Sequence, residues 1–170
     1  MSRARIGEAV GGDGAGQVAP RVSMVGLVLV THGGSGACLL SAAAEIVGPV
    51  VESSSVAVVV GEDFADVVRR VSLACDAVDT GAGLIILVDV HGSSEFQACL
   101  AMLDGSRPIE IVCGVNLPML IKLATLDRES MTPADMADVL KEVGKRSIRL
   151  GSELTGKIVT QNHSGPGDTR

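Results

Sequence analysis

The segment MVGLVLVTHGGSG at residues 24–36 decides the fold of this chain. Its first eight residues are mostly apolar and β-branched, a pattern typical of a strand buried on both faces. The glycines that follow end the strand, and an alanine-rich run with helical spacing comes next. The segment therefore predicts the start of an open parallel sheet, with His32 at the carboxyl end of a central strand, where such sheets bind ligands.

The rest of the chain repeats this alternation of strand and helix. Apolar runs at residues 56–60, 84–90 and 109–113 predict three further strands, with helical patterns between and after them. The expected fold class is α/β: a doubly wound, mostly parallel sheet in the order 2-1-3-4, with helices on both faces. Residues 155–160 are a candidate for an additional, antiparallel C-terminal edge strand.

A single domain is expected at residues 24–160. Hydrophobic residues make up 46% of the sequence and charged residues 20%, as in an ordinary globular protein. Residues 1–23 are rich in glycine and lack an apolar period, so we expect a disordered extension. Residues 161–170 are expected to be a disordered polar tail, in which His163 is solvated.

Composition argues against several classes of partner. The net charge is -6, and the chain has two Phe, no Trp and no Tyr, which disfavours nucleic-acid binding. No apolar run approaches the roughly 18 residues of a membrane span, and the N-terminal segment lacks the apolar core of a secretory signal. We therefore expect a cytoplasmic protein without direct membrane insertion.

The four cysteines are isolated from one another and show no zinc-ligand spacing. Three of them fall within runs predicted to be core, so they are expected to be small buried hydrophobes in a reducing cytosol. They are Cys38, Cys75, Cys99 and Cys113.

The expected strand order brings a histidine and a carboxylate together. The strand at 84–90 lies beside the first strand, so Asp89 ends next to His32. A carboxylate that binds one imidazole nitrogen fixes the tautomer and makes the other nitrogen more nucleophilic. Ser94 and Gln97 have capping-box spacing, so Ser94 and the free amides of a new helix would form an anion site. This arrangement suits transient histidine phosphorylation, and metal ligation is the competing use.

Three sequence blocks support a more specific interpretation. They are VLVTHG at residues 28–33, LVDVHGSSEF at residues 87–96 and GVNLPML at residues 114–120. With these blocks in this order, residues 24–150 resemble the enzyme IIA component of the mannose family of the bacterial phosphoenolpyruvate-dependent sugar phosphotransferase system (PTS). The block at residues 114–120 is the most specific of the three.

The resemblance implies a phosphotransferase component with a phosphohistidine intermediate. His32 would accept the phosphoryl group from phospho-HPr, Asp89 would orient the imidazole, and Ser94 would support the phosphoryl group, with Gly33 leaving room for it. A separate IIB protein would then receive the group during carbohydrate uptake. The family is similarly cytoplasmic and homodimeric, with a C-terminal strand that crosses to the partner subunit, and no cofactor or metal is implied.

The middle block departs from the family pattern at three positions. His91 stands where an aromatic residue is usual, Ser93 replaces a glycine and Glu95 replaces a proline. His91 and Glu95 are therefore candidate modulators of the site. Glu95 would repel a phosphoryl group that it faced directly, and phosphorylation should survive if Glu95 points to solvent at the first helical turn.

Two alternative functions stay open at this stage. The chain could be an orphan regulatory module, in which the phosphorylation state of His32 controls a partner instead of feeding transport. It could also be a small metallochelatase that uses His32 and His91 as ligands, since such enzymes also begin with a strand that ends in His-Gly.

Overall fold

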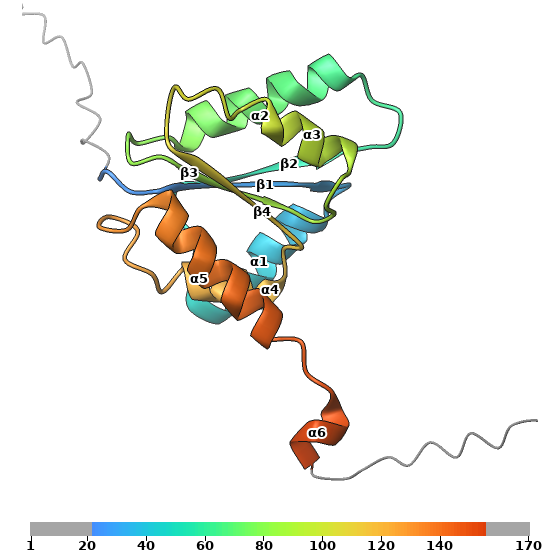
Figure 1. Cartoon of the computed structure of the whole chain (residues 1–170), viewed down its shortest axis with the longest axis vertical. Coiled ribbons are helices and arrows are strands. Elements are labelled where there is room, and N and C mark those ends of the chain that lie inside the picture. The colour runs from blue at the N-terminus through green and yellow to red at the C-terminus, as the bar shows by residue number, and fades with distance from the viewer. Residues whose placement is uncertain (1–21, 156–170) are drawn as a thin grey trace, which may run out of the picture.

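The computed structural model describes residues 22–155 of the chain. Along this part of the chain, strands and helices alternate as the sequence predicts (Figure 1). The elements are β1 Gly26–His32, α1 Ser35–Val47, β2 Ser53–Val58, α2 Phe64–Val78, β3 Leu84–Val88, α3 Ser94–Leu100, β4 Ile109–Cys113, α4 Leu117–Leu123, α5 Pro133–Arg146 and α6 Gly151–Thr155.

The described strands form one parallel sheet in the order β2-β1-β3-β4. This order and the parallel direction confirm the predicted α/β fold. In the shared register, Val30 of β1 lies opposite Val56 of β2 and Val88 of β3. Every residue of β3, and every residue of β1 before His32, is buried. The two central strands are therefore apolar on both faces because helices cover both.

Helices pack on the two faces of the sheet in two layers (Figure 1). Val28 and Val30 of β1 lie in the core cluster that includes residues of α2 and α3. Leu27 and Leu29 lie in the opposite cluster, which includes residues of α1, α4 and α5. Since successive strand residues alternate between faces, His32 continues the row of Val28 and Val30 and lies on the α3 side.

A buried arginine holds the amino end of the sheet. Arg128, only 7% exposed, precedes α5 and donates from Nε to the main-chain oxygen of Val25 at 2.8 Å. Its Nη1 donates to the oxygen of Val51 at 2.7 Å, and its Nη2 also reaches the oxygen of Glu52 at 3.2 Å. Burial lowers the pKa of this guanidinium from its ordinary value. One side chain thus ties the loop before α5 to the chain before β1 and to the chain before β2.

The structure also corrects several boundaries predicted from the sequence. The second strand begins at Ser53, and Val59 and Val60 lie beyond its end and are exposed. The last helical pattern of the sequence, which places Leu150 on its apolar face, ends earlier in the structure: Leu150 lies beyond α5 and is exposed. Thr155 ends α6, and the remainder of the expected strand at residues 155–160 lies outside the described residues.

The predicted N-terminal extension, except for residues 22 and 23, and the predicted tail at residues 161–170 also lie outside the described residues. Within residues 22–155, no helix is long and apolar enough to cross a membrane.

Candidate functional site

The turn after β1 presents His32 at the carboxyl end of the sheet. Gly33 adopts a φ of +52°, in the left-handed region that glycine enters most easily, and its amide donates to the oxygen of Val58 at 2.8 Å. Thr31 is fully buried, and its hydroxyl accepts from the amide of Gly36 at 2.8 Å. These bonds tie the turn to β2 and α1, so the main chain that carries His32 is fixed.

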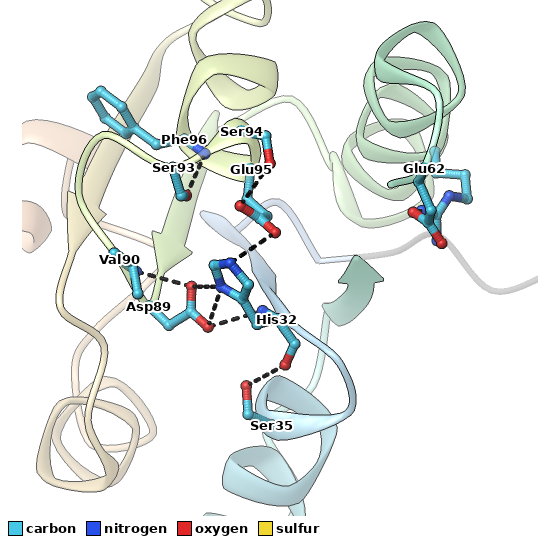
Figure 2. Close-up of polar contacts among 10 residues, drawn as sticks. His32, Ser35, Glu62, Asp89, Val90, Ser93, Ser94, Glu95 and Phe96 are labelled. Atoms are coloured by element: carbon cyan, nitrogen blue, oxygen red, sulfur yellow. Dashed lines mark hydrogen bonds and ion pairs between the residues drawn. The ribbon is translucent and has the colours of Figure 1, made fainter. Parts of the chain in front are cut away.

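Asp89 holds His32 at two points (Figure 2). Its Oδ2 accepts from the main-chain amide of His32 at 2.8 Å. Both of its carboxylate oxygens lie 3.2 Å from Nδ1 of the imidazole. The neighbouring strands β1 and β3 therefore bring the two side chains together, as the strand order predicts. With Nδ1 occupied, Nε2 is the ring nitrogen turned away from Asp89.

Glu95 contacts the other side of the same imidazole. Its Oε1 lies 3.2 Å from Nε2 of His32, and its side chain is only 3% exposed, compared with 45% for His32. The hydroxyl of Ser94 donates to Oε2 of Glu95 at 3.1 Å. Glu95 thus faces His32 and not solvent, so the condition under which it would leave phosphorylation undisturbed is not met.

The start of α3 explains why Glu95 faces inward. Ser93, not Ser94, caps this helix, and its hydroxyl accepts from the amide of Phe96 at 3.2 Å. The capping prediction from the sequence is therefore wrong by one residue. Ser94 and Glu95 become the first two helical residues, and buried Ala98 and Cys99 anchor the helix against the sheet. This packing directs Glu95 toward the end of β1.

His91 packs against an aromatic side chain of α3. Its ring contacts Phe96, with 5.0 Å between ring centroids and 42° between ring planes. Both rings line a cavity of about 450 Å³ along β4, which Glu110, Asp138 and Lys141 also border. Within residues 22–155, no set of three or more His, Cys, Asp or Glu side chains is placed to hold a metal ion. The two histidines required by the chelatase alternative thus have different neighbours.

Two cysteines of the core have strongly perturbed thiols. Cys75 of α2 and Cys99 of α3 are fully buried, and burial raises their pKa values to about 11 and about 12. Cys113 is half-buried, and Cys38 is exposed. The prediction of buried core cysteines is confirmed for Cys75 and Cys99, whereas Cys113 is only partly buried and Cys38 lies at the surface. All four thiols are free, and the two buried ones behave as small apolar side chains.

Sequence reasoning missed two contacts. The ion pair between Glu95 and Nε2 of His32 depends on which residue caps α3, and adjacent serines leave that choice open in the sequence. Arg128 is a single arginine in a loop, so no periodic pattern distinguished it from a solvated side chain.

Two named proteins are similar to this chain in sequence. The PTS system mannose-specific EIIAB component of Escherichia coli K12 is 24% identical over 125 residues, which cover 74% of this chain and 39% of that protein. This chain therefore spans about two fifths of the length of that relative. The PTS system fructose-specific EIIA component of Bacillus subtilis is 24% identical over 147 residues, which cover 86% of this chain and 97% of that protein.

Solved structures share the fold. The PTS IIA protein associated with the fucose utilization operon of Streptococcus pneumoniae superposes with a TM-score of 0.67 at 19% identity, covering 79% of this chain and 99% of that one. The mannose/sorbose-specific IIA subunit of Enterococcus faecalis gives a TM-score of 0.63 at 22% identity, covering 75% and 94%.

The family comparison agrees with these similarities. The EIIA-man family, described as PTS system fructose IIA component, matches residues 26–140. The match runs from β1 into α5 and includes His32, Asp89 and Glu95. Because it covers more than half of the chain, the protein belongs to the EIIA-man family of PTS IIA components.

Proposed function

We propose that this protein is a phosphoryl carrier that accepts a phosphoryl group from phospho-HPr on His32. It passes the group to a separate IIB protein during carbohydrate uptake. Membership of the EIIA-man family supports this proposal, as does the similarity to mannose-specific and fructose-specific PTS components. The proposal includes a cytoplasmic homodimer, as the family resemblance implies.

The observation that carries the proposal is the double contact between Asp89 and His32. A carboxylate on Nδ1 selects the tautomer with its proton on Nδ1 and leaves the lone pair of Nε2 for chemistry. In the transfer step, Nε2 attacks phosphorus and forms the N–P bond. The bond between phosphorus and its donor breaks, and the donor keeps that electron pair. Asp89 stabilises the positive charge that develops on the ring.

Ser94 and Gly33 have supporting roles in this proposal. The hydroxyl of Ser94 lies at the start of α3 and, when it releases Glu95, is free to donate to a phosphoryl oxygen. Gly33 leaves space for an incoming phosphoryl group, because it has no side chain at the turn. Its amide is not a spare donor, because it bonds to the oxygen of Val58.

Intact-mass spectrometry tests the proposal directly. The full chain is incubated with phosphoenolpyruvate, enzyme I and HPr, beside His32→Ala and the matched control His91→Ala. We expect one acid-labile phosphoryl group on the wild-type chain and on His91→Ala, and none on His32→Ala. Equal labelling of His32→Ala would exclude His32 as the acceptor. Adding a IIB protein should then discharge the labelled chain.

One observation favours the regulatory use of the same histidine. Glu95 contacts the nitrogen that must accept the phosphoryl group. This contact suits a protein whose phosphorylation is regulated better than one that transfers phosphoryl groups rapidly. In that case His32 is labelled by phospho-HPr, but the IIB proteins encoded in the same genome leave the label in place.

A further inference from the structure

The ion pair between Glu95 and His32 occupies the position that the proposed reaction needs. The carboxylate oxygen Oε1 lies 3.2 Å from Nε2, at a different edge of the ring from Asp89 (Figure 2). Glu95 is almost completely buried, and the Ser94 hydroxyl holds its second oxygen. Among the described contacts of His32, therefore, both ring nitrogens face a carboxylate.

This geometry requires a proton between Nε2 and Glu95. A carboxylate oxygen and an unprotonated imidazole nitrogen both carry lone pairs, and two lone pairs repel each other at hydrogen-bond distance. Either Nε2 carries the proton and the charged ring pairs with the carboxylate, or Glu95 carries it and its carboxyl group covers Nε2. In both states the lone pair of Nε2 is engaged and is not free to attack phosphorus.

We propose that Glu95 is a positioning residue that shields Nε2 of His32 and must withdraw before the histidine can be phosphorylated. This inference rests on the proposed phosphoryl chemistry of His32 and adds a restraint on it. The shared proton leaves with the carboxyl group of Glu95 or passes to water. Nε2 then forms the N–P bond as the donor bond breaks.

The same carboxylate acts again after transfer. Phosphoryl oxygens are negatively charged, and an ionised Glu95 returning to its place would repel them. The phosphorylated form is therefore destabilised relative to a chain without this carboxylate. Glu95 slows the loading of His32 and shortens the lifetime of the phosphohistidine.

Replacement of Glu95 is compatible with the structure of α3. Glu95 is the second residue of α3, and the equivalent position of α4 is held by Pro118 after the cap Asn116. Neither position requires its residue for an internal helical bond, because the first amides of a helix have no partner within the helix. Glu95→Ala and the isosteric Glu95→Gln should therefore both fold.

A small phosphoryl donor tests the shield without any protein partner. Phosphoramidate transfers its phosphoryl group to an imidazole nitrogen, releasing ammonia. We expect His32 in the full-length Glu95→Ala chain to be labelled roughly tenfold faster than in the wild type, since the ion pair with Glu95 no longer has to break. Glu95→Gln should label at an intermediate rate, because the amide removes the charge but keeps the bulk.

A matched control separates shielding from net charge. Glu110→Gln changes the charge by the same amount, and Glu110 is an exposed residue of the edge strand β4, with β3 between β4 and β1. We expect it to label at the wild-type rate. After removal of phosphoramidate, the phosphohistidine of Glu95→Ala should also outlast that of the wild type.

The outcomes distinguish this inference from the proposed function. Equal labelling of wild type and Glu95→Ala by phosphoramidate, or no labelling of either, would overturn the shield. Faster labelling of Glu95→Ala without transfer from phospho-HPr to any variant would support the shield and refute the phosphocarrier function. A nitrogen NMR spectrum gives a second readout: Nε2 of His32 should show a free lone pair only when Glu95 is replaced.

Discussion

The carboxylate of Asp89 holds both the main chain and the ring of His32, with its Oδ2 2.8 Å from the amide nitrogen and 3.2 Å from Nδ1. Because one group makes both contacts, the orientation of the imidazole is coupled to the backbone at the end of β1. The tautomer and the position of Nε2 are therefore fixed together.

Asp89→Asn tests this coupling. The amide oxygen of Asn can still accept from the main chain of His32, so the fold and its thermal midpoint should change little. The negative charge opposite Nδ1 is lost, and transfer from phospho-HPr should slow by roughly tenfold to a hundredfold. Single-turnover labelling measures the rate, and a rate equal to the wild type would remove Asp89 from the proposed mechanism.

Arg128→Ala should destabilise the chain without involving His32. The substitution leaves the buried oxygen of Val25 and the partly buried oxygen of Val51 without their side-chain donors. A buried unsatisfied group costs about 1–3 kcal/mol. Urea unfolding should show this loss. Arg69→Ala is the control, since Arg69 makes an exposed pair with Asp66 and should change the free energy of unfolding by less than about 1 kcal/mol. Equal effects would contradict the structural role of Arg128.

Gly36→Ala should disrupt the junction between β1 and α1. An added Cβ would lie 2.8 Å from the Ser55 hydroxyl and 2.9 Å from that of Thr31, closer than carbon normally approaches. We expect a loss of about 1–3 kcal/mol in the free energy of unfolding, as in other overpacked sites. Gly34→Ala is the matched control, because its Cβ would meet no atom within 4 Å and its φ is −83°. A similar loss in both variants would argue against this close packing.

Thiol labelling should divide the cysteines into two classes. In the native chain, Cys38 is exposed and should react promptly with iodoacetamide, whereas Cys75 and Cys99 are fully buried and should not. All four should react after unfolding in urea. Peptide mass spectrometry identifies the labelled sites, and prompt native labelling of Cys99 would contradict the packing of α3.

The buried thiols also predict a loss of stability at alkaline pH. Cys75 and Cys99 have pKa values of about 11 and about 12 in the folded chain, compared with an ordinary value of 9.0. Above pH 9 the unfolded chain releases thiol protons that the folded chain retains, so rising pH favours unfolding. Each thiol lowers the free energy of unfolding by about 1.4 kcal/mol per pH unit between 9 and its folded pKa.

Urea unfolding at a series of pH values measures this slope. Cys99→Ala should have a shallower alkaline slope than the wild type, whatever its stability at neutral pH. Cys38→Ala is the control and should keep the wild-type slope, since its thiol is exposed in both states. An unchanged slope in Cys99→Ala would exclude burial of this thiol as the cause.

The central strands and their order could be predicted because their physical signal is strong. Burial on both faces requires nearly continuous apolar runs, and the central strands β1 and β3 show them. The start of β2 was missed because Ser53, Ser54 and Ser55 lie in an edge strand that is only partly buried, where polar residues are tolerated.

The proximity of His32 and Asp89 was also predictable, since it follows from strand order alone. The position of Glu95 was not. Ser93 and Ser94 both favour helix caps, and a shift of the cap by one residue turns the following side chains of α3 by about 100° around the helix axis. Packing of Ala98 and Cys99 against the sheet makes that choice, and the sequence does not contain this tertiary information in any local pattern.

Arg128 and His32 act at opposite ends of β1. Arg128 secures the chain at Val25, before the strand, and His32 follows its last buried residue. The residue that stabilises the fold and the residue proposed to react thus lie at opposite ends of the same strand. The end of β1 that carries His32 can accept residues such as Glu95 without weakening the end held by Arg128. Substitutions near His32 can therefore alter the proposed phosphoryl chemistry while the free energy of unfolding stays nearly unchanged.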